Sequence, residues 1–281
     1  PDIVLVQGDT NTVMAGALAA AKLHIRVGHI EAGLRSFDRT MPEEINRVVA
    51  DHVSDYLFAP TETARRYLEK EGIEENKICM TGNTIVDAVF QNREIAKKKA
   101  NVLDTLGLEP HEYFLVTSHR QENVDNPEKL QSIIAGLEAV HREYGLPVIF
   151  PMHPRTRKMV ERFGVTLDGI SVMNPVGFLE FLQLESNARL VLTDSGGVQE
   201  ETCILGVPCV TLRANTERPE TIEVGANVLA GTGADEILAS AGQMLSRSGT
   251  WENPYGDGMA GRMIATICGG IPSRNNNSLI R

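Results

Sequence analysis

The feature that most constrains the fold is a repeated alternation of short apolar runs with helix-forming segments. Ile3–Gln7 is a β-type run, Thr10–Lys22 is rich in alanine, and Arg26–Ile30 returns to β-type residues. This order of strand, helix and strand is typical of an α/β protein with a parallel sheet. Further strands are expected at Tyr56–Ala59, Lys77–Thr81, Tyr113–Thr117, Pro147–Pro151, Arg189–Thr193 and Cys209–Leu212. Further helices are expected at Pro42–Asp51, Glu62–Glu71, Pro127–Tyr144, Val198–Leu205, Asp235–Ser246 and Gly258–Cys268.

The alternation falls into two sets, separated near residues 82–110 by a lysine-rich helical stretch. A length of 281 residues, at roughly 150 residues per domain, also predicts about two domains. We therefore expect two Rossmann-like domains. Residues 1–83, joined by a helix at about 258–270, form the first, and residues 84–257 form the second. Because ligands of such sheets bind outside the carboxyl ends of the strands, the informative residues should follow strands.

The composition excludes several classes of protein. With 42% hydrophobic and 23% charged residues, the chain is neither disordered, collagenous nor a coiled coil. A net charge of -10 argues against sequence-independent binding of nucleic acid, although a few local arginines can still hold a phosphate. Four scattered cysteines without a CxxC pair predict neither a zinc site nor a disulfide framework, and fit a reducing cytoplasm. No apolar run approaches the roughly 20 residues of a membrane span.

Three carboxylates of the first set follow a strand or begin a helix. Asp9 is either the N-cap of the next helix or a group that faces a ligand. Glu31 and Arg35 are four residues apart, so a local helical turn would pair them. Thr40 and Glu43 match a capping box, which is the structural alternative for Glu43. Our hypothesis is that the three carboxylates converge and raise one another's pKa, as general acid–base chemistry requires.

Two strand ends of the second set carry a histidine with an arginine nearby. His119 and Arg120 follow the first of these strands, and His153 and Arg155 follow the second. Each histidine is either a proton donor or phosphate ligand, or a structural hydrogen-bonding group. A metal site on the two histidines is not supported by HExxH or any other ligand spacing.

The most specific segment is Thr193–Glu201 (TDSGGVQEE). A strand ends, Gly196 and Gly197 expose backbone amides, and a helix begins, which predicts an anion site. Ser195 either donates its hydroxyl to a phosphate oxygen or caps the helix. Glu201, nearly two turns further along, could accept hydrogen bonds from ribose hydroxyls.

Two arginines and one aromatic residue extend this candidate site. Arg213 and Arg218 follow the next expected strand and could neutralise a diphosphate. Phe178 is either a platform on which a base stacks or a core aromatic.

Nine motifs then occur in a fixed order. They are QGDT (Gln7–Thr10), HIEAGLRS (His29–Ser36), MPEEINR (Met41–Arg47), APTET (Ala59–Thr63), TGNTIVDA (Thr81–Ala88), SHRQEN (Ser118–Asn123), HPRT (His153–Thr156), TDSGGVQEE (Thr193–Glu201) and TERPE (Thr216–Glu220). This set resembles the non-hydrolysing UDP-N-acetylglucosamine 2-epimerase family from the start of the chain to about Met263. The resemblance implies a GT-B-like fold of two Rossmann-like domains and a cytoplasmic, homodimeric enzyme that uses neither a metal nor a nicotinamide cofactor.

The resemblance also implies an activity and a set of roles. The activity is reversible epimerisation at C2 between UDP-GlcNAc and UDP-ManNAc, by elimination of UDP to 2-acetamidoglucal and its re-addition. The implied catalytic residues are Asp9, Glu31, Glu43 and His119. The implied substrate contacts are Arg47, Ser195, Gly196, Gly197, Glu201, Arg218 and Phe178. Arg120, Glu122 and His153 match part of a second UDP-GlcNAc site through which the substrate activates the enzyme.

One departure from the family concerns the start of the chain. Members carry further N-terminal residues that supply the first strands of the first domain, whereas this sequence begins at Pro1, directly before an expected strand. We therefore expect an incomplete first sheet with an exposed edge, and little activity from this polypeptide alone. Three alternative functions stay open: a hydrolysing epimerase that releases ManNAc, a UDP-sugar glycosyltransferase of the same fold, and a non-catalytic nucleotide-sugar sensor.

Overall fold

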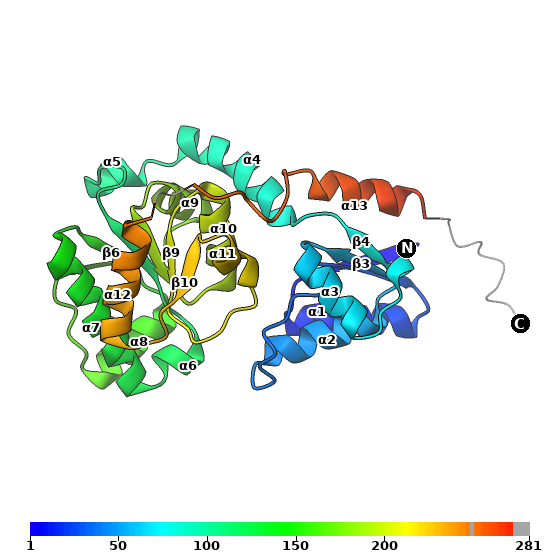
Figure 1. The fold of residues 1–281 in the computed structure, drawn as a ribbon, viewed down its shortest axis with the longest axis horizontal. Helices are drawn as coiled ribbons and strands as arrows, with labels where there is room; N and C mark the ends of the chain where they lie inside the picture. Colours follow the sequence, from blue (N-terminus) through cyan, green and yellow to red (C-terminus); the bar gives the residue numbers. More distant parts are fainter. Residues whose placement is uncertain (248–249, 272–281) are drawn as a thin grey trace, which may run out of the picture. The chain divides into compact units, whose positions relative to one another are not determined.

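The computed structural model describes residues 1–247 and 250–271. It divides into two compact units (Figure 1): Pro1–Ala88 together with the segment that begins at Tyr255, and Val89–Pro254. Each unit is built on a sheet whose paired strands are parallel. The expected α/β class with two Rossmann-like sheets is therefore confirmed.

The first unit contains a sheet with the strand order β1-β2-β3-β4. Its strands are β1 (Ile3–Gln7), β2 (Arg26–Ile30), β3 (Tyr56–Ala59) and β4 (Ile78–Met80). Its helices are α1 (Asn11–Lys22), α2 (Pro42–Val53), α3 (Glu62–Lys70), the short 3-10 helix η1 (Glu75–Lys77) and α13 (Ala260–Gly269). Small side chains such as Ala17 and Ala20 on α1 and Ala50 on α2 are buried, which lets these two helices pack closely together.

The segment that begins at Tyr255 is joined to the first unit by specific hydrogen bonds. Asn83 donates its backbone N–H to the Tyr255 carbonyl at 2.9 Å. Gly82, at φ +76°, lies so close that a Cβ there would be 2.9 Å from the same carbonyl oxygen. The Asp87 carboxylate accepts backbone N–H groups at the start of α13, from Ala260 at 3.2 Å and Gly261 at 3.1 Å. Asp87 thus supplies a cap that α13 lacks in its own sequence.

The second unit contains a sheet with the strand order β10-β9-β8-β5-β6-β7. Its strands are β5 (Phe114–Thr117), β6 (Val148–Pro151), β7 (Ile170–Met173), β8 (Leu190–Thr193), β9 (Cys209–Thr211) and β10 (Asn227–Leu229). Its helices are α5 (Val102–Leu106), α6 (Gln121–Val124), α7 (Pro127–Tyr144), α8 (Pro154–Phe163), α9 (Phe178–Ser186), α10 (Gly196–Leu205), α11 (Pro219–Glu223) and α12 (Ala234–Leu245). Helix α4 (Thr84–Lys99) leads into this unit from the first one.

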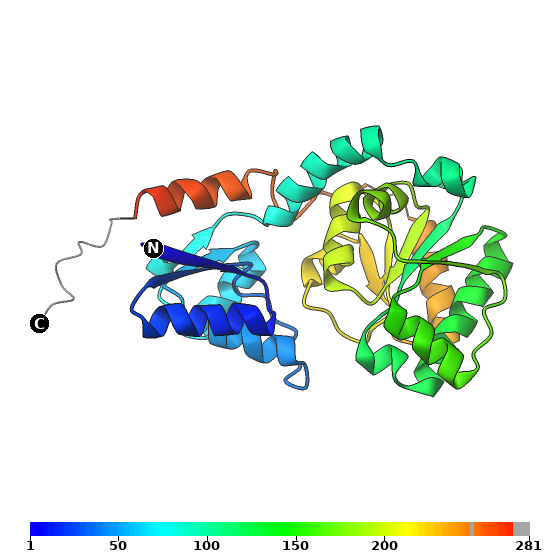
Figure 2. The ribbon, with the colours of Figure 1, turned by 180° about the vertical axis from the view of Figure 1, so that it is seen from behind.

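Alternation along β5 explains how helices cover both faces of this sheet. Phe114 and Val116 pack into one core with residues of α7 and α12, which lie side by side (Figure 1 and Figure 2). Leu115 packs into the opposite core with residues of α9 and α10. Because successive side chains of a strand point to opposite faces, a strand that is buried on both sides reads as a nearly continuous apolar run.

Strands β7 and β10 and helices α5, α6, α8, α9 and α11 were not anticipated from the sequence. Strand β7 lies at one edge of the sheet and is only partly buried, so its pattern is broken by Ser171. Strand β10 has three residues and lies at the other edge. Such short edge strands carry a weak apolar signal because neighbouring strands cover only one side of them. Among the described residues, no helix is both long and apolar enough to cross a lipid bilayer.

Candidate active site

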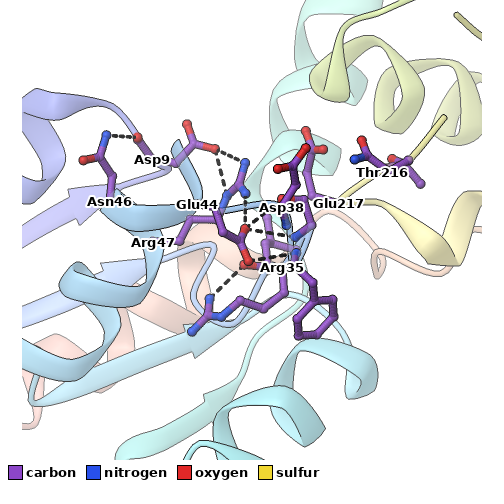
Figure 3. Close-up of polar contacts among 12 residues, drawn as sticks. Asp9, Arg35, Asp38, Glu44, Asn46, Arg47, Thr216 and Glu217 are labelled. Atoms are coloured by element: carbon purple, nitrogen blue, oxygen red, sulfur yellow. Dashed lines mark hydrogen bonds and ion pairs between the residues drawn. The ribbon is translucent and has the colours of Figure 1, made fainter. Parts of the chain in front are cut away.

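Asp9 follows β1 and is held by a buried arginine of α2 (Figure 3). Its Oδ2 atom accepts hydrogen bonds from Arg47 Nη2 at 2.7 Å and Nε at 3.0 Å. Asn46 Nδ2 donates to the Asp9 carbonyl at 2.8 Å, which fixes the main chain as well. The Asp9 side chain is still 29% exposed, whereas that of Arg47 is 3% exposed. The capping alternative for Asp9 is wrong, because Thr10 is the N-cap of α1 and accepts from the Val13 N–H.

Arg47 pairs with a second carboxylate that sequence reasoning missed. Arg47 Nη1 donates to Glu44 Oε2 at 2.7 Å, and Glu44 is buried. Glu44 also accepts from the backbone N–H groups of Ser36 and Phe37, both at 2.9 Å. The spacing of three residues between Glu44 and Arg47 on a helix could have indicated this ion pair from the sequence. Glu44 therefore orients Arg47 and orders the loop that precedes α2.

Glu43, the carboxylate singled out from the sequence, is half-buried in the first turn of α2. The predicted capping box with Thr40 is wrong, because α2 has Met41 as N-cap and no side-chain cap hydrogen bond. The Thr40 hydroxyl donates to Asp38 instead. Glu43 is thus not engaged in helix capping.

Glu31 follows β2 in a left-handed conformation, at φ +69°, which is rare for a non-glycine residue. Its Oε1 accepts a hydrogen bond from Gln7 Nε2 at 2.9 Å. The predicted pairing of Glu31 with Arg35 is wrong. Arg35 is buried and binds Asp51 Oδ2 at 2.7 Å and both carboxylate oxygens of Glu71, at 2.8 and 2.6 Å. The turn at Glu31 is not helical, so the four-residue spacing does not bring the two side chains to one face.

Asp51, another residue missed from the sequence, occupies the centre of a buried ionic cluster. It contacts His29 Nδ1 at 2.6 Å through Oδ1, and it accepts from Gly33 N at 3.2 Å through Oδ2. Burial alone would raise the pKa of Asp51, but His29 and Arg35 together lower it below its ordinary value. Gly33 has φ +83°, and a Cβ there would lie 2.4 Å from the Ala64 carbonyl oxygen, so only glycine fits.

In the second unit, Asp194 organises the loop that carries His119. Asp194 is fully buried at the end of β8 and accepts Ser118 Oγ at 2.9 Å. It also accepts the backbone N–H groups of His119 at 3.0 Å and Arg120 at 3.1 Å, and Asn123 Nδ2 at 3.2 Å. His119 Nδ1 lies 3.2 Å from Asp194 Oδ1, while the His119 side chain is 46% exposed. The position of Asp194 directly after a buried strand was the signal for this role.

A pocket of about 240 Å³ opens beside this loop. Its lining residues are Thr117, Ser118, His119, Pro151, His153, Pro175, Val176, Phe181, Ser195 and Val198. It thus brings together His119, His153 and Ser195, and the two imidazole centroids are 6.0 Å apart. Phe178 is 50% exposed and is not part of the wall, whereas Phe181, one helical turn further along α9, is.

Three arginines surround a buried carboxylate near the start of α10. Arg213 Nη2 binds Glu217 Oε2 at 2.8 Å, and Arg120 Nη2 lies 3.4 Å from Glu217 Oε1. Arg218 Nη1 lies 4.0 Å from Glu217 Oε1, and Arg218 Nε lies 2.8 Å from a second carboxylate, at Glu200 Oε1. Burial opposes ionisation of Glu217, but the arginines hold its pKa well below the ordinary value. The arginines predicted to meet a diphosphate are therefore already oriented by carboxylates.

The start of α10 has the expected form. Ser195 is its N-cap without a side-chain cap hydrogen bond, which leaves the capping alternative for its hydroxyl unsupported. Gly196 begins the helix, and a Cβ there would lie 2.4 Å from Glu217 Oε1. Further along α10, burial raises the pKa of Glu201 to about 7, next to the fully buried Glu185.

Among the described residues there is no cluster of three or more histidine, cysteine or acidic side chains that could hold a metal ion.

This chain is similar in sequence to proteins of one family. Its sequence matches the family model of UDP-N-acetylglucosamine 2-epimerase over residues 1–269. The chain belongs to this family. A UDP-N-acetylglucosamine 2-epimerase of Methanocaldococcus jannaschii is 55% identical over 275 residues, which cover 95% of this chain and 75% of that protein. A UDP-2,3-diacetamido-2,3-dideoxy-D-glucuronate 2-epimerase of Pseudomonas aeruginosa is 45% identical over 268 residues, which cover 94% and 74% respectively.

The family likeness extends to three dimensions. The crystal structure of the Methanocaldococcus jannaschii UDP-GlcNAc 2-epimerase in complex with UDP-GlcNAc and UDP matches with a TM-score of 0.90. It is 55% identical, and the match covers 96% of this chain and 76% of that one. The family indicated by the nine motifs and the expected GT-B-like fold are both confirmed.

Proposed function

We propose that this protein interconverts UDP-GlcNAc and UDP-ManNAc without net hydrolysis. The observation that carries the proposal is the geometry of Asp9 in a member of this family. Its carboxylate follows a parallel strand, is fixed by Arg47, and keeps 29% of its surface open to a ligand. A fixed but accessible carboxylate suits proton transfer, because the reacting group must be positioned before the substrate arrives.

The proposed reaction has two balanced halves. A carboxylate removes the proton from C2 while the C1–O bond breaks, so that UDP leaves and 2-acetamidoglucal forms. UDP then re-adds at C1 while an acid returns a proton to the opposite face of C2. The C2 hydrogen has no neighbouring carbonyl carbon to acidify it, so the base and the stabilisation of the leaving group must act together.

We assign proton transfer to Asp9, Glu31 and Glu43. Glu31 is restrained by Gln7, and its strained backbone is the kind of feature that concentrates at functional sites. Glu43 is free of a capping role. Arg47 orients Asp9 through two hydrogen bonds.

We assign UDP to the second unit. The diphosphate would meet Ser195, Gly196 and Gly197 at the start of α10, where backbone N–H groups and the helix dipole favour an anion. His119 would approach the same diphosphate, since it and Ser195 line one pocket.

The nucleoside would occupy the remaining contacts. Glu201 would accept hydrogen bonds from the ribose, and Arg218 would add positive charge near the diphosphate. The uracil would pack on Phe181 rather than on Phe178, since only Phe181 belongs to the apolar wall of the pocket. The role of Arg120, Glu122 and His153 in a second UDP-GlcNAc site remains part of this proposal.

A second nucleotide sugar is also a candidate substrate. The Pseudomonas aeruginosa relative, at 45% identity, is named for a diacetamido glucuronate rather than for UDP-GlcNAc. That relative is also named as a 2-epimerase. The same carboxylates would therefore act at C2 of a sugar that carries different substituents at C3 and C6.

The deciding experiment incubates the full-length protein with UDP-GlcNAc in D₂O and follows the sugar by NMR. Appearance of UDP-ManNAc with deuterium at C2 supports the proposal. Free ManNAc would indicate a hydrolysing epimerase, transfer to an added acceptor a glycosyltransferase, and binding without exchange a sensor. A parallel incubation uses the UDP-linked diacetamido glucuronate. Exchange at C2 in that incubation alone would identify this nucleotide sugar as the substrate.

The same assay tests Asp9. Asp9→Asn should abolish exchange and leave UDP affinity within about twofold, because UDP is assigned to the second unit. Asp104→Asn, on the exposed side of α5, is the matched control and should keep full exchange. Retained exchange in Asp9→Asn would remove this residue from the reaction.

A further inference from the structure

We infer that His29 is held as a permanent imidazolium whose task is to fix the Gly8–Asp9 peptide, which makes it a positioning residue for Asp9. The inference rests on the proposed function only in so far as Asp9 transfers a proton. His29 itself is fully buried in β2 and acts through the main chain rather than on a substrate.

The charge on His29 follows from what its two ring nitrogens face. Nε2 lies 2.8 Å from the Gly8 carbonyl oxygen, which can only accept a hydrogen bond. Nδ1 lies 2.6 Å from Asp51 Oδ1. The other oxygen of Asp51, Oδ2, accepts from Arg35 and Gly33, and the adjacent Arg35 cation favours the ionised carboxylate. Both ring nitrogens must therefore donate, and only the imidazolium carries two N–H groups.

The charges around His29 favour the same state. Burial alone would lower the pKa of His29, but the hydrogen bond and charge of Asp51, the Gly8 carbonyl and the charge of Glu31 raise it above the ordinary value. Arg35, the other cation of the cluster, is compensated by its own pairing with Glu71. His29 and Asp51 thus form a buried pair within a four-member chain of alternating charge, which has no net charge.

Both backbone polar groups of Gly8, the residue before Asp9, are held by hydrogen bonds. The Gly8 N–H donates to the Ile30 carbonyl at 3.1 Å, and the Gly8 carbonyl accepts from His29. Gly8 has φ +80°, so this turn depends on glycine and on its hydrogen bonds. Because the peptide is planar, fixing the Gly8 carbonyl also fixes the orientation of the Asp9 Cα. Asn46 then holds the carbonyl that follows.

A buried ion pair of this kind adds little net stability, because desolvation offsets the attraction between its charges. The pair instead contributes by holding Asp9 in position, because a shift of about 1 Å in a catalytic group can lower the rate about 100-fold. Without the imidazolium, the turn between β1 and α1 loses a hydrogen bond from a fully buried side chain.

The first test measures protonation directly. In full-length protein labelled with ¹⁵N-histidine at pH 7.5, both ring nitrogens of His29 should resonate at the shift of a protonated nitrogen. His29→Phe identifies the signals by their loss. Two separate shifts, one protonated and one not, would overturn the imidazolium.

The second test measures positioning. His29→Phe keeps the ring volume but removes both donors, and His29→Lys restores a cation with donors. We expect His29→Phe to lower kcat for C2 exchange by about 100-fold, with UDP affinity within about twofold. His29→Lys should recover part of kcat. His52→Phe, at an exposed histidine of α2, is the matched control and should leave kcat unchanged.

Amide hydrogen exchange keeps this test independent of catalysis. In His29→Phe, the Gly8 amide should exchange faster while the amides of α2 stay protected. An unchanged Gly8 amide, or equal loss of protection throughout the first unit, would overturn the positioning role. If the wild-type protein shows no C2 exchange with either sugar, the proposed function fails, but the ring-nitrogen shifts and the Gly8 amide still decide the inference.

Discussion

Asp194→Asn should destabilise the second unit strongly. The carboxylate is fully buried and accepts hydrogen bonds from Ser118 Oγ, two successive backbone N–H groups, and Asn123 Nδ2. An asparagine offers one acceptor oxygen, and its NH₂ group would face donors. Hydrogen bonds to a charged group contribute about 1 kcal/mol more than neutral ones. The loss of charge over four bonds therefore predicts a destabilisation of roughly 4 kcal/mol.

The assay is urea unfolding at pH 7, monitored by circular dichroism, with Asp168→Asn in an exposed loop as the control. Burial would raise the pKa of Asp194, but His119, Arg120 and Ser118 lower it below the ordinary value. The stabilisation is therefore complete above the ordinary aspartate pKa, about 3.9, and is lost as the pH falls through the native pKa. The difference between wild type and Asp194→Asn should be constant from pH 7 to 5 and shrink only below about pH 4. A difference under about 1 kcal/mol at pH 7 would refute the reasoning.

Two further predictions concern α10 and the helix beside it. Gly196→Ala should lower the melting temperature because the new Cβ would meet Glu217, with an overpacking cost of about 1–3 kcal/mol. Gly197→Ala should leave the melting temperature unchanged, because no neighbouring atom lies within 4 Å of the new Cβ. Equal melting temperatures for the two variants would contradict this account. Glu185→Gln should stabilise the protein more at pH 8 than at pH 5. Burial and the charge of Glu201 raise the pKa of Glu185, so the native state keeps a proton that the unfolded chain releases as the pH rises. A gain in melting temperature that is the same at both pH values would argue against it.

Much of the fold could be predicted because its central strands are buried on both faces. Runs such as those of β5 and β8 are apolar up to a final threonine, and each is followed by a polar turn and a helix. Edge strands such as β10 lack this signal because one side of them is open. The same principle identified His119, which follows the central strand β5, whereas Asp9 follows β1 at the edge of its sheet.

The contacts between side chains were harder to predict because they depend on the conformation of single turns. Spacing paired Arg35 with Glu31, yet the left-handed backbone at Glu31 redirects that residue, and Arg35 binds Asp51. The sequence singled out Glu43, whereas the carboxylate that binds Arg47 is its neighbour Glu44. A sequence gives the distance between residues along a helix, but not which of two adjacent residues faces inward when the preceding loop is irregular.

The cap that Asp87 provides to α13 bears on how the protein folds during synthesis. Residues 89–254 form one unit from a continuous stretch, so every contact within it is available once that stretch has left the ribosome. The first unit begins to emerge earlier, yet the partners of Asn83 and Asp87 are synthesised only after residue 254. The unit that carries Asp9 is therefore the last to be completed, and nascent chains that stop before α13 would carry a finished second unit beside an unfinished first one.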